Sequence, residues 1–193
     1  MMTNDSSKAS FYIDEDFYTN LLEGLRDWDN EGVYASQETR LEILNFIYRE
    51  ARLLDEGKLE DWLNLFSSEC LYWVPIIPGG GNPFKEVSLA FDDRRRLEDR
   101  IYRLRTGYAW SQTPASRTIR VFSNVEVWQD GRVDQVRVRA NFMLSELRSG
   151  KKNSYAGWCG FRLKKENGEW KITLKQVNLV DSDQGHENLT FIL

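Results

Sequence analysis

The sequence has 193 residues, of which 29% are charged and 41% hydrophobic, and its formal net charge is −4. This length fits one domain with a substantial core, and the negative charge argues against general affinity for nucleic acid, which needs a basic excess. No apolar run approaches the roughly 18–20 residues that span a bilayer. The first ten residues also lack the basic and apolar regions of a signal peptide, so we expect a cytoplasmic protein with no membrane association.

Histidine and cysteine are too scarce to build a redox-metal centre in this chain. A non-haem iron facial triad needs two histidines and a carboxylate, and a Rieske cluster needs two cysteines and two histidines. The chain has one histidine, His186, in a polar segment where we expect a solvated loop. Its two cysteines, Cys70 and Cys159, suit buried positions in a reduced compartment. We therefore expect no catalytic residue and no cofactor or metal site here.

Residues 1–35 predict an N-terminal arm, partly disordered, ahead of a single domain over residues 36–193. The first nine residues are polar. From Phe11 to Trp28, large apolar residues recur at helical intervals behind an acidic run. This pattern favours a short helix that packs on the body or on a neighbouring chain.

Two helices and a strand are predicted at the start of the domain. Ser36 is a typical N-cap and Gly57 a typical stop, so a helix is expected between them. Its wide apolar stripe, which predicts burial on most sides, contains Leu41, Leu44, Tyr48 and Ala51, flanked by Ile43, Ile47 and Leu54. A shorter helix is expected to bury Leu59, Trp62, Leu63 and Phe66. Leu71–Val74 predicts a strand that Pro75 closes.

An irregular loop and a basic helix are predicted next. Residues 75–83 contain three glycines and three prolines, which is typical of a loop. Residues 92–105 predict a helix with an apolar side and the most basic surface of the chain, formed by Arg94, Arg95, Arg96, Arg100, Arg103 and Arg105. This surface is either a solvated helix face or a docking face for an acidic partner, because Arg forms forked pairs with carboxylates.

The central feature of the sequence is a long β-hairpin over residues 116–147. Apolar and polar residues alternate from Ile119 to Trp128, and Asp130-Gly131 is a strong signal for a two-residue turn. With that turn, Gln129 faces Arg132 and Val125 faces Val136. The same register sets Ser123 against Val138, Val121 against Ala140 and Ile119 against Phe142, which gathers the apolar residues on one face.

A second hairpin and an apolar tail complete the chain. Asn167-Gly168 predicts another two-residue turn, with Leu163 facing Ile172 and Phe161 facing Leu174. The apolar phase changes after Lys175, which predicts a bulge near Lys175-Gln176 that curves the sheet. Residues 188–193 are too apolar to be left in water. Helices followed by long antiparallel strands predict an α+β fold, in which a strongly curved antiparallel sheet wraps on the N-terminal helices as a cone.

Several stretches together resemble the small (beta) subunit of aromatic-ring-hydroxylating dioxygenases, the Rieske non-haem iron oxygenases. They are YREARLLDEGKLEDWLNLF (48–66), LYWVP (71–75), DRIYRLRTGYAWSQTPASRT (99–118), VFSNV (121–125), VRANFML (138–144) and NLTFIL (188–193). The R-L-R-T-G-x-A-W and S-R-T…S-N-V segments are the most specific part. The resemblance spans roughly residues 38–193 and implies a cone similar to nuclear transport factor 2, also described as cystatin-like.

The resemblance also implies a function, that of a non-catalytic structural subunit in aromatic compound catabolism. In this family a large (alpha) subunit carries the Rieske [2Fe-2S] cluster and the mononuclear iron, commonly in a hexamer of three large and three small subunits. Electrons arrive from NADH, and the large subunit adds both atoms of O2 to an aromatic ring. A homotrimer of the isolated small subunit is also compatible with the resemblance.

Five residues are candidates for the interface with the large subunit: Trp73, Arg100, Arg103, Trp110 and Arg117. They lie in the family-like segments but outside the apparent apolar stripes, and Trp and Arg are frequent interface anchors. The rival hypothesis is a stand-alone isomerase or dehydratase of the same fold, with Tyr48, Asp55 or Tyr72 as general acid or base. A small-molecule-binding module is a further alternative.

Overall fold

The computed structural model describes residues 19–20, 28, 32–83, 85–186 and 189–193. The predicted helix between Phe11 and Trp28 lies almost entirely outside the described residues. The elements in chain order are α2 (Gln37–Asp55), α3 (Leu59–Leu63), β1 (Phe66–Pro75), β2 (Ser88–Asp93), α4 (Arg94–Thr106), the 3-10 helix η3 (Trp110–Gln112), β3 (Arg117–Asp130), β4 (Arg132–Arg148), β5 (Lys151–Glu166) and β6 (Glu169–Leu179). None of the helices in this described part is both long and apolar enough to cross a membrane.

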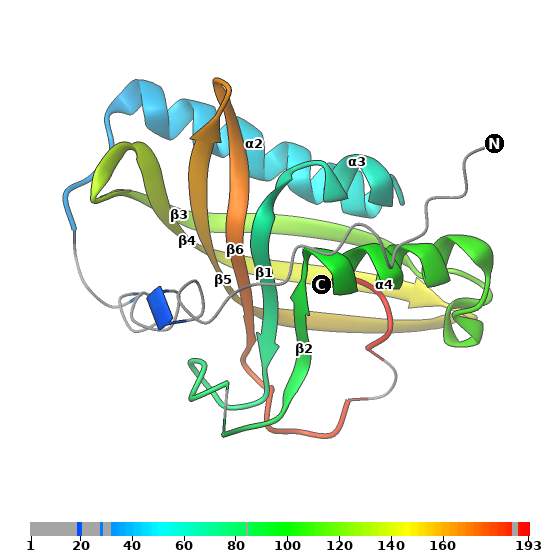
Figure 1. The fold of residues 1–193 in the computed structure, drawn as a ribbon. Helices are drawn as coiled ribbons and strands as arrows, with labels where there is room; N and C mark the ends of the chain where they lie inside the picture. The colour runs from blue at the N-terminus through cyan, green and yellow to red at the C-terminus, as the bar shows by residue number, and fades with distance from the viewer. Residues whose placement is uncertain (1–18, 21–27, 29–31, 84, 187–188) are drawn as a thin grey trace.

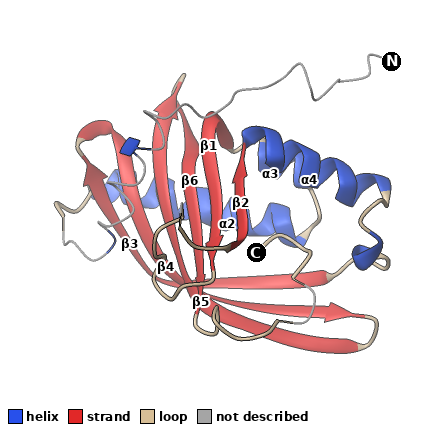
Figure 2. Ribbon diagram, turned by 60° about the horizontal axis from the view of Figure 1, so that its bottom comes forward, coloured by secondary structure: helices blue, strands red, loops and turns tan. Residues whose placement is uncertain are grey.

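The predicted α+β cone is confirmed by one six-stranded sheet that curves around the helices (Figure 1). The strand order is β2-β1-β6-β5-β4-β3, and the long strands bend as they cross the molecule (Figure 2). Helix α2 packs against β3, α3 lies beside the end of α2, and α4 packs against β1, β2 and α3 (Figure 1). One strand pair, β1 with β6, is parallel, so the sheet is mixed and not wholly antiparallel as the sequence predicted. Parallel pairing joins segments that are distant in the sequence, so no local sequence pattern predicts it.

The ends of α2 follow the predicted signals, but its buried stripe does not. The Ser36 side chain accepts a hydrogen bond from the backbone N–H of Thr39, which satisfies one of the free donors at the helix start. Ile43 and Ile47 are completely buried, whereas Leu41 and Tyr48 are 61% and 51% exposed. The prediction of burial on most sides was therefore wrong, because the helix packs on the sheet through one face.

The β3–β4 hairpin exists, but its predicted register was wrong. Gln129 pairs with Val136, and Val127 with Val138, so the strands are displaced by four residues from the expected pairing. A second shift lies between Ser123 and Glu126, where Asn124 has a positive φ of 50°. This bulge reverses the alternation along β3. Consequently the first half of β3 turns two predicted core residues outward, Ile119 and Val121.

The β5–β6 hairpin follows the prediction closely. Glu166 pairs with Glu169 across Asn167-Gly168, both of which have positive φ, and Leu163 pairs with Ile172 as expected. The predicted bulge is present but lies earlier, with Thr173 as the extra residue, so Leu174 pairs with Arg162 and not with Phe161. Leu174 therefore faces the outer side of the sheet with Trp28 and Trp73, while Val177 returns to the main core.

Part of the arm ahead of α2 lies along the sheet. Residues 33–35 pair with the end of β3 through bonds from Ala35 N–H to the Val127 carbonyl (3.0 Å) and from Gln129 N–H to the Val33 carbonyl (2.9 Å). This pairing covers a stretch of strand edge that would otherwise be open. Further back, the Trp28 indole donates to the Gln176 side chain at 2.8 Å across the outer face.

Candidate functional site

The concave side of the sheet, where a cone can hold a ligand, contains residues 189–193 of the chain itself. Phe191, Ile192 and Leu193 are buried in the main hydrophobic core, as the sequence predicted for this apolar tail. Their backbone is held by side chains of the sheet. The Arg120 guanidinium donates to the Ile192 carbonyl, and Lys175 Nζ donates to the Leu193 carbonyl at 2.9 Å. The tail thus fills much of the cone interior.

A buried ion pair lies beneath this tail. Lys175 Nζ is 2.7 Å from Glu50 Oε1, and the two side chains are 1% and 0% exposed. The Trp62 indole donates to the same carboxylate oxygen at 2.6 Å, and the ammonium lies 5.7–5.8 Å from the ring centres of Trp62, Tyr72 and Phe161. This pair was not predicted from the sequence. Its signal was a charged residue, Glu50, at a position of the apolar helical stripe.

A second polar cluster joins the end of α2 to the start of β3. Asp55 accepts hydrogen bonds from the Thr118 hydroxyl and from the backbone N–H of Arg120, both at 2.9 Å, and it also pairs with the Arg120 guanidinium. The Arg120 side chain is 3% exposed. Because its carboxylate already accepts these bonds, Asp55 acts as a link between two elements.

The three candidates of the rival enzyme hypothesis do not converge on one site. Tyr48 lies on the exposed side of α2, and Asp55 is committed to Arg120 and Thr118. The Tyr72 hydroxyl donates to the Leu193 carbonyl and accepts from the Leu193 N–H, and burial raises its pKa well above the usual value. Asp55 and Tyr72 are therefore engaged in structural contacts and Tyr48 is on the surface, so these three residues form no acid–base pair.

His186 and the two cysteines are all largely buried. The His186 side chain is only 9% exposed, with Nε2 3.7 Å from Asp181 Oδ1, so the expectation of a solvated loop histidine was wrong. It lies against the Tyr155 ring, which covers it. Burial raises the pKa of both the Cys70 and Cys159 thiols to about 12. Among the described residues, no group of three or more His, Cys, Asp or Glu could hold a metal ion.

Exposed aromatic and Arg side chains gather where α4 ends and η3 begins. Gly107, with φ of 76°, ends α4 in the left-handed region and redirects the chain. The residues exposed here, which we call the α4–η3 surface, are Tyr102, Arg103, Tyr108, Trp110 and Arg117. Trp110 is 84% exposed, the most of the three aromatic side chains. Within the described part of the chain, the Arg103, Trp110 and Arg117 side chains make no hydrogen bond or ion pair, so they are available to a partner.

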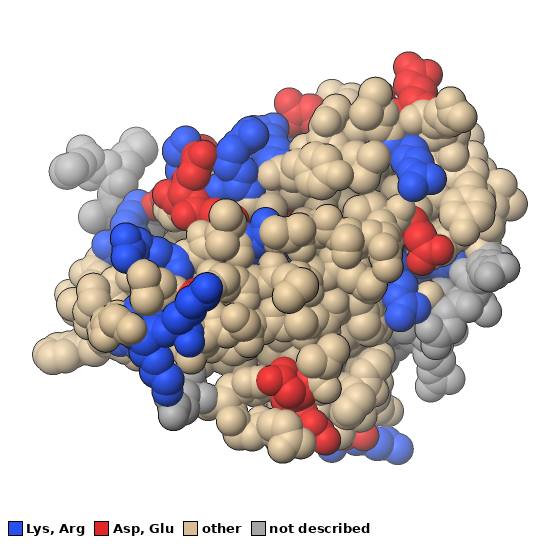
Figure 3. Space-filling view, turned by 180° about the vertical axis from the view of Figure 1, so that it is seen from behind, with Lys and Arg blue, Asp and Glu red and all other residues tan. Residues whose placement is uncertain are grey.

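The other two predicted interface residues are used inside the chain. Trp73 is 1% exposed, packs edge-on against Phe91 and donates from its indole to the Ser88 hydroxyl at 2.8 Å. It therefore leaves the set of interface candidates, because β2, which the sequence did not predict, covers it. Arg100 pairs with Asp92 at 2.5 Å and lines the inner side of α4. Seen from behind, Lys and Arg gather toward one end of the molecule, and the middle of that face carries few charges (Figure 3).

Comparison with known proteins gives consistent results over most of the chain. A family model described as "Ring hydroxylating beta subunit" matches residues 49–183. The small oxygenase component of the p-cumate 2,3-dioxygenase system of Pseudomonas putida is 30% identical over 163 residues, which cover 83% of this chain and 90% of that protein. The small subunit of 2-halobenzoate 1,2-dioxygenase of Burkholderia cepacia is 33% identical over 149 residues, covering 74% and 89%.

Solved structures share the fold. The beta subunit of benzoate 1,2-dioxygenase from Burkholderia mallei superposes with a TM-score of 0.63 and 28% identity, covering 78% of this chain and 95% of that one. A naphthalene 1,2-dioxygenase structure matches with a TM-score of 0.72 over the whole of both chains, at 20% identity. At that level of identity the second likeness concerns the fold alone.

Proposed function

Because the chain belongs to the family of ring-hydroxylating beta subunits, we propose that it is the structural small subunit of an aromatic-ring-hydroxylating dioxygenase. In this assignment the chain braces a large subunit and performs no chemistry itself. The large subunit holds the Rieske cluster and the mononuclear iron, receives electrons from NADH and hydroxylates the aromatic substrate. The single histidine and the two buried cysteines of this chain are in keeping with iron held elsewhere.

The observation that carries the proposal is the filled interior of the cone. Residues 191–193 occupy the concave side of the sheet, and their carbonyls accept bonds from Arg120 and Lys175. The buried charged groups of the interior are also paired with one another, Glu50 with Lys175 and Asp55 with Arg120. An independent isomerase or dehydratase would need a free acid or base facing its substrate, so the pairing of these groups favours a structural role over the rival hypothesis.

We propose the α4–η3 surface as the contact with the large subunit. Aromatic and Arg side chains are enriched in the cores of protein interfaces, where they act as anchors. Trp110 and Arg103 are exposed and have no partner among the described residues, and Arg117 adds a further positive charge. The matching surface of the large subunit would be acidic with an apolar recess. The complex would be a cytoplasmic hexamer of three large and three small subunits.

Charge reversal at Arg103 tests this interface directly. We expect Arg103→Glu and Trp110→Ala each to weaken the affinity for a tagged large subunit by about tenfold or more, because each removes an anchor side chain. A tenfold loss of affinity corresponds to about 1.4 kcal/mol. Arg132→Glu provides the matched control, because Arg132 is an exposed Arg at the tip of the distant β3–β4 hairpin. Binding would be quantified by native mass spectrometry of the complex.

Two results would count against the proposal. Unchanged assembly of both variants, with normal folding, would place the large-subunit contact elsewhere on this chain. Turnover of an aromatic, ketone or hydroxy-acid substrate by the purified small subunit alone would instead favour an independent enzyme. The two measurements separate an error in the interface from an error in the function.

A further inference from the structure

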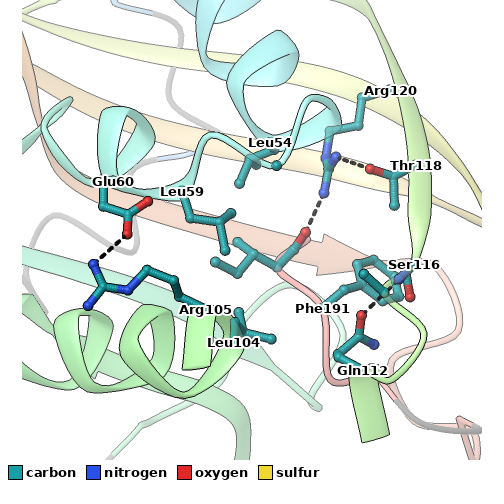
Figure 4. A pocket seen from close by; sticks show the side chains of 13 residues that line it. Leu54, Leu59, Glu60, Leu104, Arg105, Gln112, Ser116, Thr118, Arg120 and Phe191 are labelled. Carbon is teal, nitrogen blue, oxygen red and sulfur yellow. Dashed lines mark hydrogen bonds and ion pairs between the residues drawn. The ribbon is translucent and has the colours of Figure 1, made fainter. Parts of the chain in front are cut away.

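The segment between α4 and β3, which carries part of the α4–η3 surface, is incompletely packed on its inner side. A cavity of about 230 Å³ lies between this segment, α3, the ends of α2 and α4, and residues 191–192 of the tail. Its lining includes Gln112, Ser116 and Arg120 (Figure 4). Side chains that face a void lose packing contacts on that side. Hydrogen bonds therefore contribute more than apolar burial to the position of this segment.

The Gln112 side chain joins η3 to two other parts of the chain. Its Nε2 donates to the Thr190 hydroxyl at 2.8 Å. Its Oε1 accepts from the backbone N–H of Ser116 at 3.1 Å (Figure 4). This second bond fixes the orientation of the amide, because a backbone N–H can only donate. Both ends of the Gln112 amide are therefore engaged, one with the tail and one with the residue before β3.

Both partners of Gln112 are themselves anchored in the body of the protein. Thr190 directly precedes residues 191–193, which are buried in the main core. The Ser116 hydroxyl donates to Glu146 Oε1 at 2.5 Å, and Glu146 is 3% exposed. Gln112 thus connects an exposed 3-10 helix to two fixed points, one in the tail and one on β4.

We propose that Gln112 is a positioning residue for the contact with the large subunit. Trp110 lies two residues before it in η3, and Arg117 directly follows its partner Ser116. The bond from Ser116 to Gln112 therefore sets the spacing of the two exposed side chains, and the bond to Thr190 makes that spacing depend on the buried tail. Fixing contact residues before binding lowers the entropy cost of association. This inference rests on the α4–η3 surface proposed above and adds that the interior of the cone controls it.

Thr190→Val tests the link to the tail, because valine keeps the shape of threonine and lacks the hydroxyl that accepts the bond. We expect the affinity for a tagged large subunit to fall by about three- to tenfold, the range of one neutral hydrogen bond. Thr190→Ser keeps the hydroxyl and should retain the wild-type affinity. The double variant Gln112→Met with Thr190→Val should lose no more affinity than Gln112→Met alone, because both changes remove the same bond.

NMR order parameters of the isolated full-length chain give a readout that needs no large subunit. In Thr190→Val we expect the backbone order parameters of residues 110–116 to fall from about 0.85, typical of rigid backbone, to below about 0.6. Those of the β5–β6 hairpin should not change, and Thr190→Ser should resemble the wild type. Unchanged order in residues 110–116 of Thr190→Val would overturn the positioning role.

The affinity measurements separate this inference from the interface on which it rests. Loss of affinity in Trp110→Ala without loss in Thr190→Val would overturn the positioning role and leave the contact in place. No loss in either variant would overturn the contact, and this inference with it. Equal losses in Thr190→Val and Thr190→Ser, or additive losses in the double variant, would mean that Thr190 acts through packing and not through Gln112.

Discussion

Lys175 illustrates how a charged residue can lie in the core of this protein. Its ammonium is completely enclosed, yet it has the Glu50 carboxylate at 2.7 Å, the Leu193 carbonyl at 2.9 Å and three aromatic rings around it. Desolvation of such a pair is costly and is offset only when the geometry is good and other polar groups add bonds. Here the pair also connects α2, β6 and the tail, so one interaction positions three segments.

Removal of one partner of this pair should be strongly destabilising. We expect Lys175→Met to lower the free energy of unfolding by about 3–5 kcal/mol, because it leaves the Glu50 carboxylate buried without its cation. Urea denaturation followed by circular dichroism would measure the loss. The double variant Lys175→Met with Glu50→Gln should recover part of the stability. A single variant as stable as the wild type would mean that the buried charge finds another partner.

At the scale of elements, the two hairpins have similar turn signals and different outcomes. At Asn167-Gly168 both residues have positive φ, and the strands pair directly on either side. At Asp130-Gly131 only Gly131 has a positive φ. Asp130 pairs with Arg132, but the next residue of β3, Gln129, pairs with Val136. Trp128 near this second turn stacks on Tyr34 and lies under the Arg137 guanidinium. The observed β3–β4 register differs from the one that a two-residue turn at Asp130-Gly131 would give. It is accompanied by contacts of Trp128 with residues outside the turn.

The Asn167-Gly168 turn needs a glycine because of the backbone conformation of Gly168, and not because a side chain there would clash with its neighbours. Gly168 has φ of 84°, and a Cβ there would meet no atom within 4 Å. We expect Gly168→Ala to lower the free energy of unfolding by about 1–2 kcal/mol, the cost of left-handed backbone for an L-residue. Gly185→Ala is the control, since Gly185 also has open space but no positive φ. Equal stability of the two variants in thermal unfolding would contradict this account of the turn.

At the scale of the whole molecule, the bulges and the tail determine the shape. The irregularities near Asn124 in β3 and at Thr173 in β6 each change which side chains face inward, and bulges bend the strands that carry them. The curved sheet then encloses α2 and residues 191–193 in one continuous core. Both cysteines lie in this core, so ionisation of their thiols in solvent requires the core to unfold.

The buried thiols predict a loss of stability at high pH. In the folded chain the pKa of each thiol is raised by burial from 9.0 to about 12, whereas the unfolded chain ionises near the ordinary value. The stability of the folded chain that depends on these protonated thiols is therefore fully present below pH 9 and is lost progressively as the pH rises toward 12. Between those values each thiol should lower the free energy of unfolding by up to about 1.4 kcal/mol per pH unit.

Denaturant unfolding from pH 8 to pH 11 would measure this effect. The Cys70→Ala/Cys159→Ala variant serves as reference for the tyrosines and lysines that titrate in the same range. A steeper decline in the wild type than in this variant is expected. Parallel declines would mean that the thiols reach solvent without global unfolding.

The sequence by itself determined the features that depend on local chemistry. Ser36 and Gly57 bounded α2, Asn167-Gly168 defined a turn, and the hydrophobicity of residues 188–193 required a buried tail. The scarcity of histidine and the family-like segments indicated a subunit without its own iron. Each signal acts over a few residues or over composition, so no knowledge of distant neighbours was needed.

Only the tertiary structure decided the register of β3 with β4, the parallel pairing of β1 with β6, and the partners of Glu50 and Lys175. These depend on segments 100 or more residues apart or on bulges whose cost is offset by packing elsewhere. The candidate sites also depend on contacts between segments distant in the sequence. Trp73 was predicted to be exposed at an interface, but residues of β2 pack against it. The cavity beside Arg120 forms where α2, α3, α4 and β3 meet the tail.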